Sequence, residues 1–112
     1  MKIVDKILAV DELKKMAAAA FGNMVKAAVD VDRELIAVDA ELHSDLEALL
    51  LEDGSKQKNI WGINLYPDMH GEEFIELDSL INIRPSHGNR SRGVENEEMR
   101  KKIISIVSKR IG

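Results

Sequence analysis

Positive charge and hydrogen-bond donors gather in one segment of an otherwise acidic chain, from Arg84 to Val94. This segment, RPSHGNRSRGV, contains three arginines and one histidine but no aspartate or glutamate. Arginine presents a planar fork of donors that matches a carboxylate or a phosphate, and glycine lets backbone amides approach a ligand closely. The pattern predicts a site for a small anion, such as a phosphate-bearing molecule. Its candidate residues are Arg84, His87, Asn89, Arg90, Ser91 and Arg92.

The same arginines have acidic neighbours within the chain, which gives a second interpretation of the segment. The flanking acids are Glu72, Glu73, Glu76, Asp78, Glu95, Glu97 and Glu98. Ion pairs with these acids, or hydrogen bonds to backbone carbonyls, would make the arginines structural. The spacing matches neither a P-loop nor a dinucleotide-binding fingerprint. The segment therefore predicts anion binding without a named nucleotide motif.

A second set of candidate ligands is formed by His43, Asp45 and Glu47. On a strand, their spacing of two would place all three on one face, where they would suit a metal ion in a metal-assisted hydrolase. On a helix, only His43 and Glu47 would share a face, and a solvated polar edge is the alternative. No serine lies in a G-x-S-x-G motif, and no cysteine is present. No motif therefore assigns a reaction or a cofactor.

Helices and strands on either side must position these residues. Residues 11–21 carry apolar side chains at helical spacing, and they predict a helix with Asp11 as its N-cap. Residues 24–31 alternate with period two, which predicts a strand. A polar turn at 32–34 then leads into a return strand over 36–40, which completes a hairpin.

The segment 44–52 fits two structures. Ser44 and Glu47 have the spacing of a capping box, which favours a helix. The apolar run is short, however, and it stops at the turn signal DGS at 53–55. We therefore predict a strand over about 46–52, paired with a strand over 59–66.

The last predicted strand, FIELDSLINIR at 74–84, alternates in side-chain character and ends where Pro85 removes a backbone donor. Asn96 then predicts the N-cap of a C-terminal helix, whose first turn carries Glu97 and Glu98. The predicted fold class is α+β, with a mostly antiparallel sheet of four to five strands. An N-terminal and a C-terminal helix are expected to pack on one face of that sheet.

Three residues in the predicted strands bear on the interior of the fold. Trp61, the single tryptophan, is predicted to lie in the core or in an interface. Asn64 and Asn82 occupy strand positions where one register would call for an apolar side chain. We expect them either to line a shared polar pocket or to face water.

The composition indicates one soluble domain over residues 1–112, with 45% hydrophobic and 32% charged residues. No apolar run is long enough to span a bilayer, the N-terminus does not resemble a secretory signal, and cysteine is absent. We therefore expect a cytoplasmic protein without membrane contact. The net charge of −4 argues against nucleic acid as a partner. An exposed edge strand of the hairpin at 24–40 would suit a protein partner or a homo-oligomer.

Three segments carry a family resemblance: LHSDLEALLLEDGS, NIWGINLYP and INIRPSHGNRSRGVENEEMRKKI. From about Leu13 to the C-terminus, the chain resembles an uncharacterised family of small prokaryotic proteins catalogued as a domain of unknown function. The resemblance implies a stand-alone, single-domain cytoplasmic protein. It implies no activity and no catalytic residues.

Overall fold

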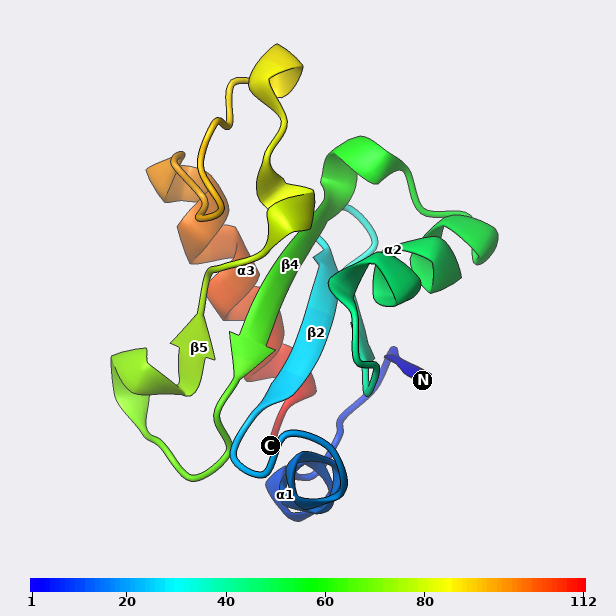
Figure 1. Ribbon diagram of the computed structural model, residues 1–112, viewed down its shortest axis with the longest axis vertical. Helices are drawn as coiled ribbons and strands as arrows, with labels where there is room; N and C mark the ends of the chain where they lie inside the picture. Colours follow the sequence, from blue (N-terminus) through cyan, green and yellow to red (C-terminus); the bar gives the residue numbers. More distant parts are fainter.

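The computed structural model describes residues 1–112 and shows a five-stranded sheet with helices on both faces (Figure 1). The strands are β1 (Lys2–Val4), β2 (Val25–Asp30), β3 (Leu35–Val38), β4 (Ile60–Leu65) and β5 (Ile75–Glu76). They lie in the order β1-β3-β2-β4-β5, and every neighbouring pair is antiparallel. The helices are α1 (Val10–Ala19), α2 (His43–Glu52) and α3 (Glu97–Arg110). The predicted α+β fold class is confirmed.

Side-chain alternation gives the sheet two apolar faces. On one face, Val29, Ile63 and their neighbours join the larger core, to which α1 contributes Leu13 and α3 contributes Ile103. On the other face, residues such as Ala28 and Ile60 form a smaller core with Leu46 and Leu50 of α2. In Figure 1, α2 lies in front of the sheet and α3 lies behind it. The first and last helices therefore share a face, as predicted, and α2 covers the opposite face.

The predicted hairpin is confirmed as β2 and β3. Its turn is stabilised by Asp30, whose Oδ1 accepts hydrogen bonds from the amides of Asp32 at 2.9 Å and Arg33 at 3.1 Å. Both strands lie inside the sheet, because β3 also pairs with β1 and β2 also pairs with β4. The prediction that this hairpin offers an exposed edge is therefore wrong, since the edges are β1 and β5.

Helix α1 begins earlier than predicted. Its N-cap is Ala9, whose carbonyl accepts hydrogen bonds from the amides of Glu12 and Leu13, both at 3.1 Å. Asp11 is therefore not the cap. It lies with Glu12 in the first turn, where carboxylates interact favourably with the helix dipole.

The strand predicted over 46–52 is wrong, because these residues belong to α2. Leu46 and Leu50, four residues apart, both point into the smaller core. The DGS signal ends the helix instead of turning a hairpin. Gly54 adopts φ +107°, its amide donates to the Leu51 carbonyl at 3.1 Å, and the Ser55 amide donates to the Leu50 carbonyl at 2.9 Å. This is the Schellman arrangement, in which a left-handed glycine closes a helix.

The strand predicted over 74–84 is correct only at its start. β5 ends at Glu76, and Leu80–Asn82 form a short 3-10 helix. The Ser79 amide donates to the Arg92 carbonyl at 2.9 Å, and the Asn82 side chain exchanges hydrogen bonds with the backbone of Gly62 at 2.8 and 2.9 Å. Hydrogen bonds to residues distant in the sequence, from the Ser79 backbone and the Asn82 side chain, thus replace the ladder that a longer strand would need.

The C-terminal helix α3 is confirmed together with its cap, since Asn96 Oδ1 accepts from the Met99 amide at 2.9 Å. Its far end meets the N-terminal segment. The Leu8 amide donates to the Arg110 carbonyl at 2.7 Å, and the Gly112 amide donates to the Leu8 carbonyl at 3.0 Å. No helix of the fold is both long enough and apolar enough to cross a membrane.

Candidate functional site

The predicted arginines do not converge on one point. The Arg84 guanidinium lies over the Trp61 ring, 4.4 Å from its centroid. It donates to the carbonyls of Gln57 at 2.9 Å and of Ile60. Burial lowers the pKa of Arg84, and nearby Glu47 opposes this shift. Arg84 therefore ties its segment to the entry of β4.

Arg92 and Arg90 differ in their partners. Arg92 forms a two-pronged ion pair with Asp78, with its Nε 2.9 Å from Oδ1 and its Nη2 3.0 Å from Oδ2. This pairing lowers the pKa of Asp78. The exposed Arg90 side chain makes no hydrogen bond or ion pair, although its backbone amide donates to Glu95. Arg90 is thus the one member of the three with an unengaged guanidinium.

The remaining members of the loop set have different roles. Asn89 is 4% exposed, and its amide nitrogen donates to the carbonyls of Asn82, Ser91 and Gly93 at 2.7 to 3.1 Å. Its Oδ1 accepts from the Glu95 amide at 2.9 Å. The Ser91 amide donates to the Glu95 carboxylate at 3.0 Å, while His87 is exposed. Asn89 therefore organises the loop from within.

The metal candidates lie on α2 and not on a strand, so His43 and Glu47 share a face of the helix but Asp45 does not join them. His43 is buried and its Nε2 is 2.7 Å from the Ile63 carbonyl. Asp45 is exposed and Glu47 is half-buried. No group of three histidine, aspartate or glutamate side chains is placed to hold a metal ion.

The structure brings His43 and Arg92 to a common cleft, although the sequence had placed them in separate sites. This polar cleft has a volume of about 470 Å³ and lies between the start of α2, the ends of β2, β4 and β5, and the segment 78–81. Its polar lining residues are Lys26, His43, Ser44, Asn64, Glu76, Asp78, Ser79 and Arg92. The volume is within the range of small-molecule sites, in which placed polar groups fix the orientation of the ligand, although most such sites have more apolar walls than this cleft.

The floor of the polar cleft is a row of three polar side chains on adjacent strands. Lys26 on β2 is directly opposite Asn64 on β4, and Asn64 is directly opposite Glu76 on β5. Directly opposed residues have their Cβ atoms about 5 Å apart. The Lys26 ammonium lies 5.2 Å from the centre of the Phe21 ring and makes no ion pair. Register thus aligns a cation, an amide and a carboxylate.

The Asn64 side chain has a fixed orientation and leaves one atom without a partner. Its amide nitrogen donates to Glu76 Oε1 at 2.8 Å and to the Asp78 carbonyl at 3.3 Å. Both partners are acceptors, so the amide cannot be flipped without bringing two oxygens together. Asn64 Oδ1 is then left buried with no hydrogen-bond partner, on a residue that is only 6% exposed. An orphaned buried acceptor is costly unless a ligand or water completes it.

His43 presents a hydrogen-bond acceptor to the polar cleft. Burial lowers the pKa of His43, the Ile63 carbonyl opposes the shift, and the charge of Lys26 adds to it. Because the Ile63 carbonyl can only accept, the neutral ring carries its proton on Nε2. Nδ1 is then an acceptor with no protein donor. A side-chain hydrogen bond to Asn64 also opposes the lowering of the His43 pKa, because the protonated ring can donate to it. With the neutral ring, Asn64 Oδ1 has no partner.

The N-terminus of α2 opens on the same cleft. No side chain caps it, and the amides of His43 and Ser44 donate to no protein acceptor. Free amides at a helix start, together with the helix dipole, favour an anion. Asp45 also lies in the first turn, but it does not line the cleft.

Comparison with known proteins identifies a family and no individual relative. A family model described as a protein of unknown function (DUF5674) matches residues 2–110. The chain belongs to this family. No curated protein and no solved structure matches it. The resemblance noted in the sequence is therefore confirmed at the level of the DUF5674 family.

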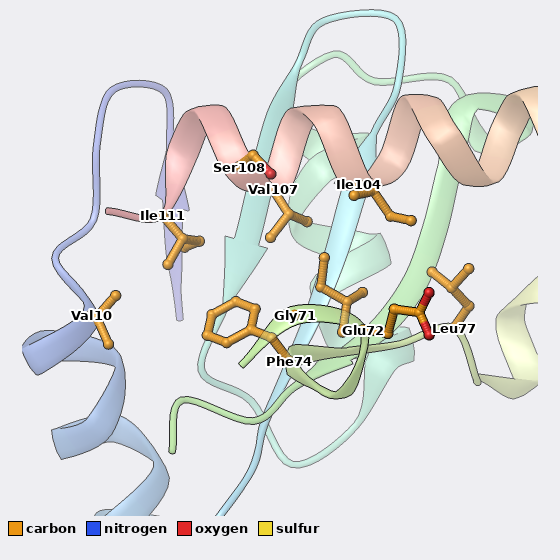
Figure 2. A pocket seen from close by; sticks show the side chains of 10 residues that line it. Val10, Gly71, Glu72, Phe74, Leu77, Ile104, Val107, Ser108 and Ile111 are labelled. Atoms are coloured by element: carbon orange, nitrogen blue, oxygen red, sulfur yellow. The ribbon is translucent and has the colours of Figure 1, made fainter. Parts of the chain in front are cut away.

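A second hollow of this DUF5674 protein lies between α3 and the segment 71–77 (Figure 2). This apolar groove has a volume of about 800 Å³. Figure 2 shows Phe74 extending toward Val10 and Ile111, and Ile104 and Val107 projecting from α3 into the gap. The polar side chains in its lining are those of Glu72 and Ser108. The groove therefore differs from the polar cleft in chemistry.

Lys26 and Glu76 were not predicted as site residues, and Asn64 was predicted only as one of a pair. Each is a polar residue on a strand whose neighbours are mostly apolar, and this is the signal that marks them. Asn82 does not join Asn64 in the cleft, because its side chain is fully engaged with Gly62 and Arg92 backbone groups. Neither alternative offered for the two asparagines holds, because they do not share a pocket and both are buried from water.

Proposed function

We propose that this protein binds a small ligand with an anionic group, and that the anion occupies the polar cleft beside Lys26. The observation that carries the proposal is that Lys26, whose ammonium has no ion-pair partner, lines the same cleft as the uncapped start of α2. A lysine ammonium and free helix amides are complementary to a carboxylate or phosphate. The buried Asn64 Oδ1, which has no donor, supports a ligand that carries a hydrogen-bond donor in addition to its anionic group.

The proposal retains the anionic ligand predicted from the sequence but places it in the polar cleft and not at the loop 84–94. Arg84 is committed to backbone carbonyls and Arg92 to Asp78, so neither guanidinium offers a free charge. Arg92 still lines the cleft and supplies part of its wall. Arg90 retains a free guanidinium, and it serves as the test of the original loop site.

The experiment is an NMR titration with inorganic phosphate and with ethyl phosphate, at low ionic strength because salt screens exposed charges. Replacing Lys26→Met preserves the aliphatic stem and removes the charge. We expect the dissociation constant for ethyl phosphate to rise at least about tenfold, which corresponds to 1.4 kcal/mol of binding free energy. The shifted amides should include those of His43 and Ser44.

Two variants control for general electrostatics. Lys58→Met removes an exposed charge outside the cleft, and Arg90→Ala removes the free guanidinium of the loop. Both should bind ethyl phosphate within about twofold of the parent protein, as expected for distant, screened charges. Loss of binding in Arg90→Ala with no effect of Lys26→Met would place the anion at the loop and overturn the proposal. No binding of either phosphate, and none of the carboxylate propionate, would also reject it.

A further inference from the structure

We infer that the ligand of the polar cleft is a small zwitterion, in which an ammonium group and a carboxylate or phosphate are separated by about 5 to 10 Å, or one to two strand spacings. The inference rests on the proposed function, because it places the anionic group beside Lys26. It adds a second recognition element, an ammonium group held by Asn64 and Glu76. The charges of the cleft, the orphaned acceptor and the strand register each support it.

The lining of the cleft carries charges of both signs, and not all of them are paired with each other. Arg92 and Asp78 neutralise each other through their two-pronged ion pair. Two charges then remain without an ion-pair partner, the Lys26 ammonium and the Glu76 carboxylate. A ligand that complements both must carry one charge of each sign. A simple anion would leave Glu76 unpaired and close to the added negative charge, which is unfavourable.

Hydrogen-bond acceptors gather at the end of the cleft formed by Asn64 and Glu76. Asn64 Oδ1 is buried and unpartnered, and only a donor can satisfy it. Glu76 Oε1 already accepts from the Asn64 amide at 2.8 Å and from the Tyr66 hydroxyl at 3.1 Å, so Oε2 is available. An ammonium has three donors and no acceptor. It therefore fits this end of the cleft better than a hydroxyl or a second anion would.

The spacing of the lining residues across the strands sets the length of the ligand. Lys26, Asn64 and Glu76 are successive cross-strand neighbours, so the anionic and cationic ends of the site are one to two strand spacings apart. One such spacing is about 5 Å. A short amino acid or amino phosphate has its charged ends separated by a similar length. Larger molecules would have to extend out of the cleft.

The experiment compares matched probes that differ only in the ammonium group. O-Phosphoethanolamine is paired with ethyl phosphate, and β-alanine is paired with propionate, so that the phosphate and carboxylate sources are tested separately. We expect the ammonium-bearing member of at least one pair to bind about tenfold or more tightly than its partner, a preference worth 1.4 kcal/mol. The readout is the dissociation constant from NMR titration.

The variant Glu76→Gln tests the origin of this preference. The glutamine retains an oxygen for Asn64 and Tyr66 but removes the charge, so the fold should be preserved. We expect the ammonium preference to fall to about threefold or less, while ethyl phosphate binds at least as tightly as before. Tyr66→Phe is the control, because it removes a hydrogen bond to Glu76 and leaves the carboxylate charge. It should retain most of the preference.

Failure of this inference is distinct from failure of the proposed function. Binding of ethyl phosphate and O-phosphoethanolamine with equal affinity, lost in Lys26→Met, would support the anion site and overturn the zwitterion. An ammonium preference that survives Glu76→Gln and Asn64→Leu, with both variants folded by their amide spectra, would also overturn it. Absence of binding by all four probes would overturn both proposals.

Discussion

The polar cleft and the apolar groove share one wall, but they differ in whether the groups that line them have hydrogen-bond or ion-pair partners within the protein. The segment from Ile75 to Asp78 alternates between them. Ile75 and Leu77 line the groove, whereas Glu76 and Asp78 line the cleft. Extended backbone directs successive side chains to opposite sides, so four residues separate two environments.

The difference favours the cleft over the groove as the place of the ligand that we propose. Apolar walls such as those of the groove can exist beside water at a modest cost, and exposed apolar surface is common in folded proteins. The cleft instead contains a half-buried ammonium and an exposed carboxylate without ion-pair partners, and a buried amide oxygen without a donor. A buried acceptor without a donor is costly, so the amide oxygen of Asn64 points to an interaction that the fold alone does not supply.

The largest effect is expected from Gly62→Ala, which should disturb the cleft and leave the groove unchanged. A Cβ at this position would lie 2.5 Å from both Ser79 Cβ and Ser79 Oγ, and 3.0 Å from Ile81 Cγ1. Ser79 Cβ is fixed to its backbone and cannot rotate away, so the cleft wall must move. We expect urea denaturation to show a loss of about 2–3 kcal/mol in the free energy of unfolding.

The matched control for this substitution is Gly93→Ala, whose Cβ would meet its nearest atom, the Leu77 carbonyl oxygen, at 3.4 Å. This contact is close to ordinary, and the expected loss is below about 1 kcal/mol. In Gly62→Ala the methyl resonances of Ile104 and Val107 should stay near their parent positions. Equal losses in the two variants would contradict a close approach of 79–81 to β4.

Substitutions at two adjacent residues of the shared segment compare how much its groove side and its cleft side contribute to stability. Leu77→Ala removes a half-buried side chain that packs against the larger core, and it should lower the free energy of unfolding by about 1–2 kcal/mol. Asp78→Ala removes an exposed ion pair, and its cost should be within about 0.5 kcal/mol. Thermal and urea melts of both variants provide the measurement. The reverse order of effects would mean that the cleft side of the segment carries its stability.

The last expected effect concerns pH, to which the cleft should respond through His43. Its folded-state pKa is lowered, so below about pH 6.5 the unfolded chain binds a proton that the folded protein does not. Stability should therefore decline as pH falls below this value, by at most about 1.4 kcal/mol per pH unit. It should stop declining from this cause once the folded histidine is itself protonated.

The measurement is the free energy of unfolding from urea melts between pH 7.5 and 5.0. His43→Gln retains an Nε2 donor for the Ile63 carbonyl and cannot titrate, so its curve should be flatter than that of the parent. His70→Gln and His87→Gln remove exposed histidines and serve as controls. Identical curves for the parent and His43→Gln would exclude His43 as the source.

Elements with regular patterns were predictable from the sequence. The alternation over 24–31 gave β2, and the asparagine cap gave α3, because both signals are local. The signal at 53–55 was ambiguous, since a glycine with positive φ ends a helix as readily as it turns a hairpin. Only the packing of Leu46 and Leu50 against the sheet decides between the two.

The candidate site depended on information that the sequence does not contain. Lys26, Asn64 and Glu76 are far apart along the chain and meet through strand register, which no local pattern specifies. The loop arginines were found by composition, but their partners were set by tertiary contacts. Arg92 faces Asp78 across fourteen positions, and Arg84 reaches the backbone at Gln57 and Ile60.

The hydrogen bonds between Leu8 and the end of α3 have a kinetic consequence. They join positions about one hundred residues apart, so they depend on nearly the whole polypeptide being arranged first. Closing so large a loop costs more conformational entropy than any local turn. We therefore expect these hydrogen bonds to form among the last contacts during folding and to break among the first during unfolding.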